Sequence, residues 1–178
     1  MTLLCDDKYL WVIANRGTTY HILGRYEEAI ADFNRLISVN EKDLWAITNR
    51  GITYQLLNEF EQAIKEFDFA ISIDENYAWA LANRGNNKRM LGKFEDALQD
   101  FNRAITLDDK FLDAIKRRGQ TYESMQKYAE ALADFDRFLG FEKNDSWVYA
   151  HRGNAYENLG EYEKAIEDYN RAIALNGN

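Results

Sequence analysis

The sequence predicts an all-α chain built from five tandem helical hairpins, and three observations support that fold class. Glycines recur at a constant step of 34 residues along the whole chain. Apolar residues between these glycines follow helical spacing, and the 178 residues include no proline, which would interrupt helices. A fixed period of roughly 20 to 50 residues is typical of repeat arrays. Each repeat should therefore form one pair of helices, A and B.

Four columns of residues keep the same place in every repeat. An arginine precedes each glycine, an alanine follows the glycine by twelve residues, and an aromatic residue follows it by sixteen. The glycine column is Gly17, Gly51, Gly85, Gly119 and Gly153. These columns predict an N-terminal arm at 1–9 and repeats at 10–43, 44–77, 78–111, 112–145 and 146–178, with positions numbered from the first residue of each repeat.

Each element of the hairpin follows from one local pattern. Helix A is predicted from a stripe at positions 4, 8 and 11, and helix B from a second stripe that includes the alanine and aromatic columns. Between the helices, position 15 carries residues that tolerate the left-handed end of a helix: Gly24, Asn58, Gly92, Gln126 and Gly160. Short acceptor side chains are predicted to cap the next helix A, the candidates being Asp43, Asn76, Asp109 and Asp145.

The motif around each glycine resembles the signature of the tetratricopeptide repeat family. In the first repeat, Gly17 is followed by Tyr20, Gly24, Tyr26, Ala29 and Phe33 at the family's spacing, and the resemblance covers 10–178. The family's proline at the end of helix B is replaced here by other residues, which bears on the turn and not on the fold. The resemblance implies an α-solenoid, a right-handed superhelix in which the A helices line a concave groove that binds peptides or protein elements.

The groove face of helix A is predicted to carry a tryptophan and an asparagine column. All four tryptophans occupy position 2, where they either pack between A helices as core or act as aromatic anchors, the residue type that often dominates interfaces. Asparagines at position 6 either solvate the helix or hold the backbone of an extended ligand, because an amide both donates and accepts. An acidic ligand group would meet the cationic residues. The predicted site comprises Trp11, Asn15, Trp45, Asn49, Ile52, Trp79, Asn83, Asn86, Arg89, Lys116, Arg117, Trp147, His151 and Asn154.

The arginine column is predicted to be structural. An acidic residue lies sixteen residues after every one of these arginines, and this one-to-one match favours ion pairs between helices A and B over a ladder of ligand contacts. The acidic column is Asp32, Glu66, Asp100, Asp134 and Asp168.

Composition counts against several classes of function. The net charge of −8 is a poor match for a phosphate backbone. Cys5 is the one cysteine, so neither an internal disulfide nor a cysteine-based metal cluster is expected. With His21 and His151 far apart and no phosphate loop or nucleophile motif, we predict neither an enzyme nor a cofactor. No export or membrane-anchoring segment is recognisable, so the expected location is cytoplasmic.

We therefore predict a protein–protein interaction module, acting as a scaffold, adaptor or sensor, with a protein or peptide ligand in its groove. The first alternative is homo-oligomerisation through an uncapped end of the array, because the apolar segment 172–175 is not followed by a polar capping helix. Excision from a larger multidomain protein would explain the same feature. The second alternative is single-stranded RNA binding by base stacking on tryptophan, which the missing cationic stripe disfavours.

Overall fold

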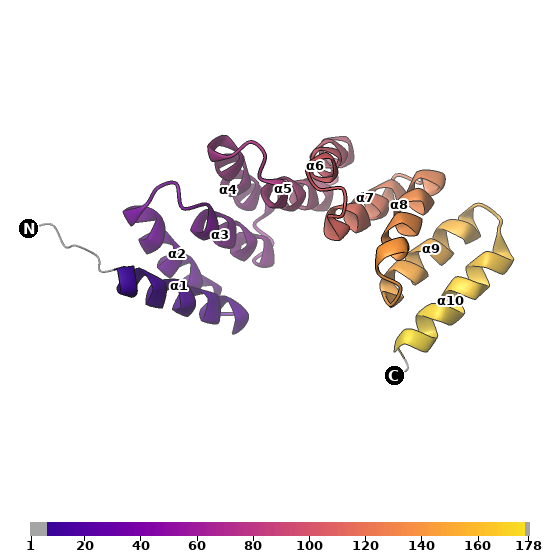
Figure 1. The fold of residues 1–178 in the computed structure, drawn as a ribbon, viewed down its shortest axis with the longest axis horizontal. Coiled ribbons are helices and arrows are strands. Elements are labelled where there is room, and N and C mark those ends of the chain that lie inside the picture. Colours follow the sequence, from indigo (N-terminus) through magenta and orange to yellow (C-terminus); the bar gives the residue numbers. More distant parts are fainter. Residues whose placement is uncertain (1–6, 177–178) are drawn as a thin grey trace, which may run out of the picture. The chain divides into compact units, whose positions relative to one another are not determined.

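The computed structural model describes residues 7–176, and this part of the chain folds into α-helices without any strand (Figure 1). The predicted all-α class is confirmed. α1 begins inside the segment expected to be an arm, whereas Cys5 lies outside the described residues. The helices are α1 Asp7–Ile22, α2 Tyr26–Val39, α3 Leu44–Leu56, α4 Phe60–Ile73, α5 Ala78–Met90, α6 Phe94–Leu107, α7 Leu112–Ser124, α8 Tyr128–Phe141, α9 Ser146–Asn158 and α10 Tyr162–Asn176.

The chain divides into two compact parts, Met1–Leu91 and Gly92–Asn178. In the first part, α1 packs on α2 and α3 packs on α4, while α2 contacts α3, α4 contacts α5, and the A helices α1, α3 and α5 also touch in sequence. In the second part, α7 pairs with α8 and α9 with α10, α6 contacts α7, and α8 contacts α9. Within each compact part, consecutive helices thus pack on one another. Within residues 7–176, every helix falls short of the length and apolarity that a membrane span requires.

In the first, second, fourth and fifth hairpins, an aromatic ring of helix B packs against the glycine of helix A. Phe33, Phe67 and Phe135 are completely buried. A Cβ placed on Gly17 would lie 3.0 Å from the Phe33 ring, and one on Gly119 would lie 2.7 Å from the Phe135 ring. Because contacts of 3.0 Å or less leave no room for a side chain, glycine is what allows helices A and B to approach.

The turn between helices A and B adopts the left-handed backbone in all five repeats, as predicted. The φ angles are 72° at Gly24, 60° at Asn58, 74° at Gly92, 59° at Gln126 and 79° at Gly160. Only glycine enters this region without steric cost, and other residues lose roughly 1–2 kcal/mol. Gln126 is therefore held in a strained conformation by the hairpin around it.

Replacing Gln126 with glycine is expected to raise the free energy of unfolding by about 1 kcal/mol, because the removed strain outweighs the extra freedom of glycine in the unfolded chain. Urea denaturation followed by circular dichroism measures this change. Gly160→Ala, at the same position of the last repeat, should change stability in the opposite direction. A Gln126→Gly variant less stable than the wild type would contradict the argument.

Two of the four predicted helix caps are confirmed. The Asp43 side chain accepts a hydrogen bond from the Ala46 amide at 3.1 Å, and Asp145 accepts one from the Val148 amide at 2.9 Å. The expectation for the other two repeats was wrong. Tyr77 and Phe111 occupy the cap positions of α5 and α7 and make no side-chain cap bond. Asn76 and Asp109 precede those positions by one and two residues, so they cannot replace the capping aspartates.

The arginine column is structural in repeats 1, 2, 4 and 5, which confirms the predicted pairing of helices A and B there. The Arg118 guanidinium, for example, donates to both carboxylate oxygens of Asp134, at 2.8 and 2.5 Å, and this bonding raises its pKa. The equivalent ion pairs are Arg16 with Asp32, Arg50 with Glu66, and Arg152 with Asp168. These arginines are therefore committed to holding each hairpin closed.

The arginines of this column in repeats 2 to 5 also reach back to the preceding repeat, to a partner that the sequence pattern did not reveal. The acceptor lies at position 25, which alternates between Asn and Asp. The bonds join Arg50 to Asn34 at 2.6 Å, Arg84 to Asp68 at 2.7 Å, Arg118 to Asn102 at 2.7 Å, and Arg152 to Asp136 at 2.7 Å. One arginine thus links two hairpins.

Candidate functional site

Trp11, Trp45 and Trp79 of the tryptophan column are exposed on the A helices, and the Trp45 ring also touches the core. The exposed fractions are 44% for Trp45 and 38% for Trp79, and Trp11 is more exposed still. Trp45 meets the buried Phe33 ring edge-on at 5.8 Å. Packing against the core thus fixes the Trp45 ring and leaves much of its surface open, whereas a role of the column as ligand anchors stays a prediction.

A hollow of about 430 Å³ lies between α3 and α5 in the first compact part. Trp45 and Trp79 stand on its two sides, and Tyr77 stacks on Trp79 with ring centroids 6.5 Å apart. Thr48, Asn49 and Ile52 complete the lining. None of these six side chains carries a charge, so the hollow suits a neutral, largely apolar group.

The asparagine column is held in place by the helix itself. The side-chain amides of Asn15, Asn49 and Asn83 each donate to the backbone carbonyl of the tryptophan four residues earlier, at 2.7, 2.7 and 2.8 Å. A primary amide that has made this bond still has a second N–H and its carbonyl oxygen to offer. Asn49 therefore presents one donor and one acceptor, in a fixed orientation, at the wall of the hollow.

Other polar residues of the first part form hydrogen bonds between neighbouring A helices. His21 Nδ1 lies 2.9 Å from Thr53 Oγ1, and Asn87 donates to Gln55 Oε1 at 2.9 Å. Burial lowers the pKa of His21. These bonds tie α1 to α3 and α3 to α5, so the helices that frame the hollow are fixed relative to each other.

Asn86 and Arg89, both predicted to meet a ligand, are bonded to each other. Asn86 is buried and accepts a hydrogen bond from the Arg89 guanidinium at 3.1 Å. The helical wheel of a single helix cannot reveal that Asn86 is buried, because burial depends on what packs against the helix. Asn86 consequently offers little surface to a ligand.

In the second compact part, the cations predicted to receive an acidic ligand are already paired. Lys116 Nζ lies 2.6 Å from Asp145 and 4.6 Å from the centre of the Trp147 ring. Arg117 donates to Asp113 at 2.7 Å. A hollow of about 360 Å³ beside these groups is lined by Asp113, Lys116 and Arg117 together with Gln120 and Trp147. An acidic ligand would have to compete with the two aspartates.

The remaining predicted residues of this part converge on Glu123, which sequence analysis did not include in the site. His151 Nδ1 lies 2.6 Å from one oxygen of Glu123, and Asn154 donates to the other. The imidazole also packs against Trp147, with centroids 3.7 Å apart and ring planes inclined by 35°. Trp147 is half-buried between these neighbours. The second part therefore forms an internally bonded cluster, in contrast to the open hollow of the first.

Two family models, both described as tetratricopeptide repeat, match the chain. One matches 12–43 and 46–77, and the other matches 78–111 and 146–178. Together they cover most of the sequence. The chain belongs to the tetratricopeptide repeat family. Proteins of this family are generally protein–protein interaction modules.

Solved tetratricopeptide structures share the fold at low sequence identity. The chain is similar to MamA from Desulfovibrio magneticus (TM-score 0.83, 15% identity, 94% of this chain and 94% of that one). It is also similar to a tetratricopeptide repeat protein from Parabacteroides merdae (0.80, 22%, 93% and 65%). A third is YrrB, described as having an unusual peptide-binding site (0.72, 19%, 92% and 84%). No curated protein matches the chain by sequence.

Within this tetratricopeptide array, the lining of the hollow includes a residue that the helix A pattern missed. Tyr77 is the cap residue immediately before α5, so it lies outside the helical stripes from which the face was predicted. The signal was present in the sequence as an aromatic residue two places before Trp79. Because the backbone is not yet helical at Tyr77, that spacing allows the two rings to stack.

Proposed function

We propose that the chain is a non-enzymatic interaction module that binds a peptide segment through the hollow between α3 and α5. The observation that carries this proposal is a pair of exposed tryptophans, Trp45 and Trp79, on either side of an uncharged hollow of about 430 Å³. Aromatic residues in such pockets are the usual anchors of protein interfaces. The repeat fold, and the peptide-binding site described for YrrB, favour the same class of ligand.

The lining indicates how a peptide would be held. A large apolar side chain of the ligand enters between the two indole rings, over Ile52. Its main chain lies along α3, where Asn49 donates to a carbonyl and accepts from an amide. Asn83 offers the same pair of groups on α5. Since Tyr77 and Phe33 already hold the tryptophan rings, little side-chain freedom is lost on binding.

Charge separates this site from the cluster around Trp147. The hollow between α3 and α5 has no charged lining, whereas Lys116 and Arg117 are bonded to aspartates. Binding through the apolar hollow should therefore depend little on salt, because screening acts on charges and not on buried apolar area. An acidic ligand held by Lys116 or Arg117 would dissociate as the salt concentration rises.

Selection of peptides on the immobilised chain tests the proposal. Peptides enriched from a random library are expected to share one large apolar residue. Their affinity, measured by fluorescence anisotropy, should fall about thirtyfold with Trp79→Ala, which corresponds to about 2 kcal/mol at an interface anchor. The Trp45→Ala/Trp79→Ala variant should lose more.

Phe69→Ala provides the matched control, because Phe69 on α4 is 43% exposed, much like Trp45, but does not line the hollow. This variant should bind within about twofold of the wild type, and circular dichroism should show that every variant remains helical. Selection of no peptide, or equal binding by the double variant and the wild type, would refute the proposal.

A further inference from the structure

Helix α1 exposes the face that the later A helices bury. Position 3 is 0% exposed at Ala46, Ala80, Ala114 and Val148, but Val12 is 51% exposed. Position 10 is likewise buried at Thr53, Asn87, Thr121 and Ala155, but exposed at Thr19. Positions 3, 7 and 10 lie on one side of a helix. One half of a repeat-to-repeat interface is therefore open on α1.

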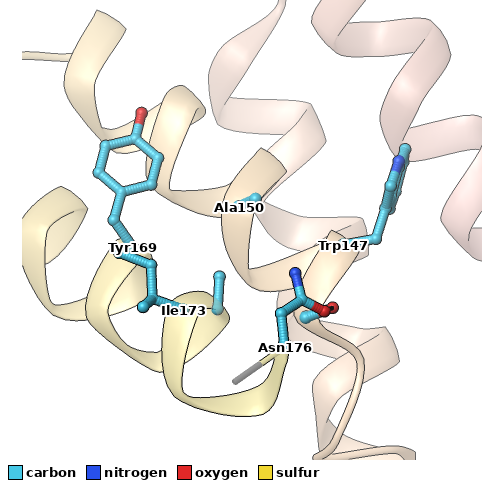
Figure 2. A pocket seen from close by; sticks show the side chains of 7 residues that line it. Trp147, Ala150, Tyr169, Ile173 and Asn176 are labelled. Atoms are coloured by element: carbon cyan, nitrogen blue, oxygen red, sulfur yellow. Dashed lines mark hydrogen bonds between the residues drawn. The ribbon is translucent and has the colours of Figure 1, made fainter. Parts of the chain in front are cut away.

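The matching half is open on α9 and α10. Ile173 is 69% exposed, whereas Leu139, its counterpart one repeat earlier, is 7% exposed beneath the next hairpin. Figure 2 shows Ile173 and Tyr169 on α10 bordering a hollow that Ala150 and Trp147 reach from α9. The hollow measures about 790 Å³. Its lining is mostly apolar, as expected of a surface that packs against another helix.

At two interfaces inside the chain, the corresponding place is taken by the tryptophan of the next helix A. Trp147 meets the buried ring of Phe135 edge-on at 6.3 Å, as Trp45 meets Phe33 at 5.8 Å. Tyr169 holds the position of Phe135 in the last repeat. Trp11, the tryptophan of the first repeat, is strongly exposed. The chain thus carries both an open hollow for such a ring and an exposed ring of the right kind.

The polar groups of the two faces are complementary as well. Arg50, Arg118 and Arg152, which donate to position 25 of the preceding repeat, have side chains that are 18–20% exposed. The Arg16 side chain is 53% exposed, and Asn170, the position 25 residue of the last repeat, is exposed on α10. An arginine and its acceptor are therefore available at opposite ends of the repeat series.

We propose that the chain associates with a second copy of itself, head to tail, through these two faces. α1 of one copy occupies the place of a next helix A on α9 and α10 of the other. Trp11 enters the hollow beside Tyr169, Val12 packs toward Ile173, and Arg16 donates to Asn170. The contact repeats the interface between hairpins inside the chain. Because it joins two different surfaces, it can build rings or open filaments.

Sedimentation velocity of the full chain over a concentration series, from about 1 µM to about 1 mM, tests the proposal. The weight-average mass of the wild type should rise above the 20.8 kDa of one chain. Val12→Asp and Ile173→Asp should each weaken association at least tenfold, because a carboxylate would have to lose its water in the contact.

An equimolar mixture of the two variants gives the decisive result. The Val12→Asp copy keeps an intact α10 face, and the Ile173→Asp copy keeps an intact α1 face. The mixture should therefore reach twice the mass of one chain and stop there, while each variant alone stays at the mass of one chain. A two-fold symmetric contact that used the same face on both copies would not show this complementation.

Val39→Asp is the matched control for Val12→Asp. Val39 is 50% exposed on α2, and its counterparts Leu107 and Phe141 are exposed in inner repeats too, so the substitution should leave association unchanged. Trp11→Ala, which introduces no charge, should weaken association at least tenfold. It replaces Val12→Asp as the test if that aspartate variant fails to fold. The proposal is overturned if the wild type keeps the mass of one chain throughout, if the mixture does not dimerise, or if Val39→Asp dissociates the assembly as strongly as Val12→Asp.

Discussion

Replacing Gly119 with leucine is expected to lower the free energy of unfolding by about 3 kcal/mol. A Cβ at this position would lie 2.7 Å from the Phe135 ring and 3.2 Å from the Asp134 Cβ, and the leucine branches would extend further into the same space. Phe135 is completely buried, so it has no free volume to move into. The gain in helix propensity over glycine, about 1 kcal/mol, is too small to offset this overpacking.

Gly140 offers the control for Gly119, because both are helical glycines of the fourth repeat. A Cβ on Gly140 would meet nothing within 4 Å. Gly140→Ala should therefore raise stability by roughly 0.5–1 kcal/mol, while Gly119→Ala should lower it. Urea denaturation followed by circular dichroism measures the direction of the stability change in both variants. If Gly119→Leu unfolds at the same urea concentration as the wild type, glycine is not what sets the spacing of helices A and B.

Replacing Arg118 with methionine is expected to cost about 3–5 kcal/mol, the usual effect of leaving a buried charge without its partner. The Asp134 side chain is 5% exposed and receives two hydrogen bonds from this guanidinium. Asn102 would lose its bond to Arg118 in the same variant. Methionine keeps much of the length of the arginine side chain, so lost packing explains only a small part of the change.

Two further variants separate the lost ion pair from other effects. Arg118→Met/Asp134→Leu should recover much of the stability, because replacing both members of a buried pair is often close to neutral. Arg25→Met should cost less than Arg118→Met, because the Arg25 and Glu28 side chains are 53% and 44% exposed and their ion pair is screened by water. Equal losses for Arg25→Met and Arg118→Met in urea denaturation would argue against the burial-based explanation.

The fold could be predicted almost completely because each element depends on local, repeated residues. The turn column illustrates this: Gln126 has little preference for a left-handed backbone, yet its alignment with Gly24 and Gly92 predicted the conformation that it adopts. The caps show the limit of such reasoning. A cap must occupy one defined residue, and the displacement of Asn76 by one place was enough to make that prediction wrong.

The candidate site could be predicted only as far as a single helix determines it. The period of helix A placed Trp45 and Asn49 on the exposed face, and they line the hollow. Pairs that depend on how neighbouring helices pack were missed. Lys116 meets Asp145, 29 residues away, and Glu123 meets His151, 28 residues away. No pattern within one helix encodes those distances, so the cations were predicted to be available to a ligand.

The arginines that bond to two hairpins also have a consequence for how the array opens. Arg152 holds Asp168 in its own hairpin and Asp136 in the one before, so unwinding of either hairpin removes a partner from the other. The stability of a repeat array is approximately the sum of intrinsic repeat terms and nearest-neighbour terms, and a shared guanidinium adds to the nearest-neighbour term. Backbone amides in the middle of each compact part should therefore exchange with solvent only in large cooperative events. Amides of α1, whose Arg16 bonds within its own hairpin, should exchange through local fraying.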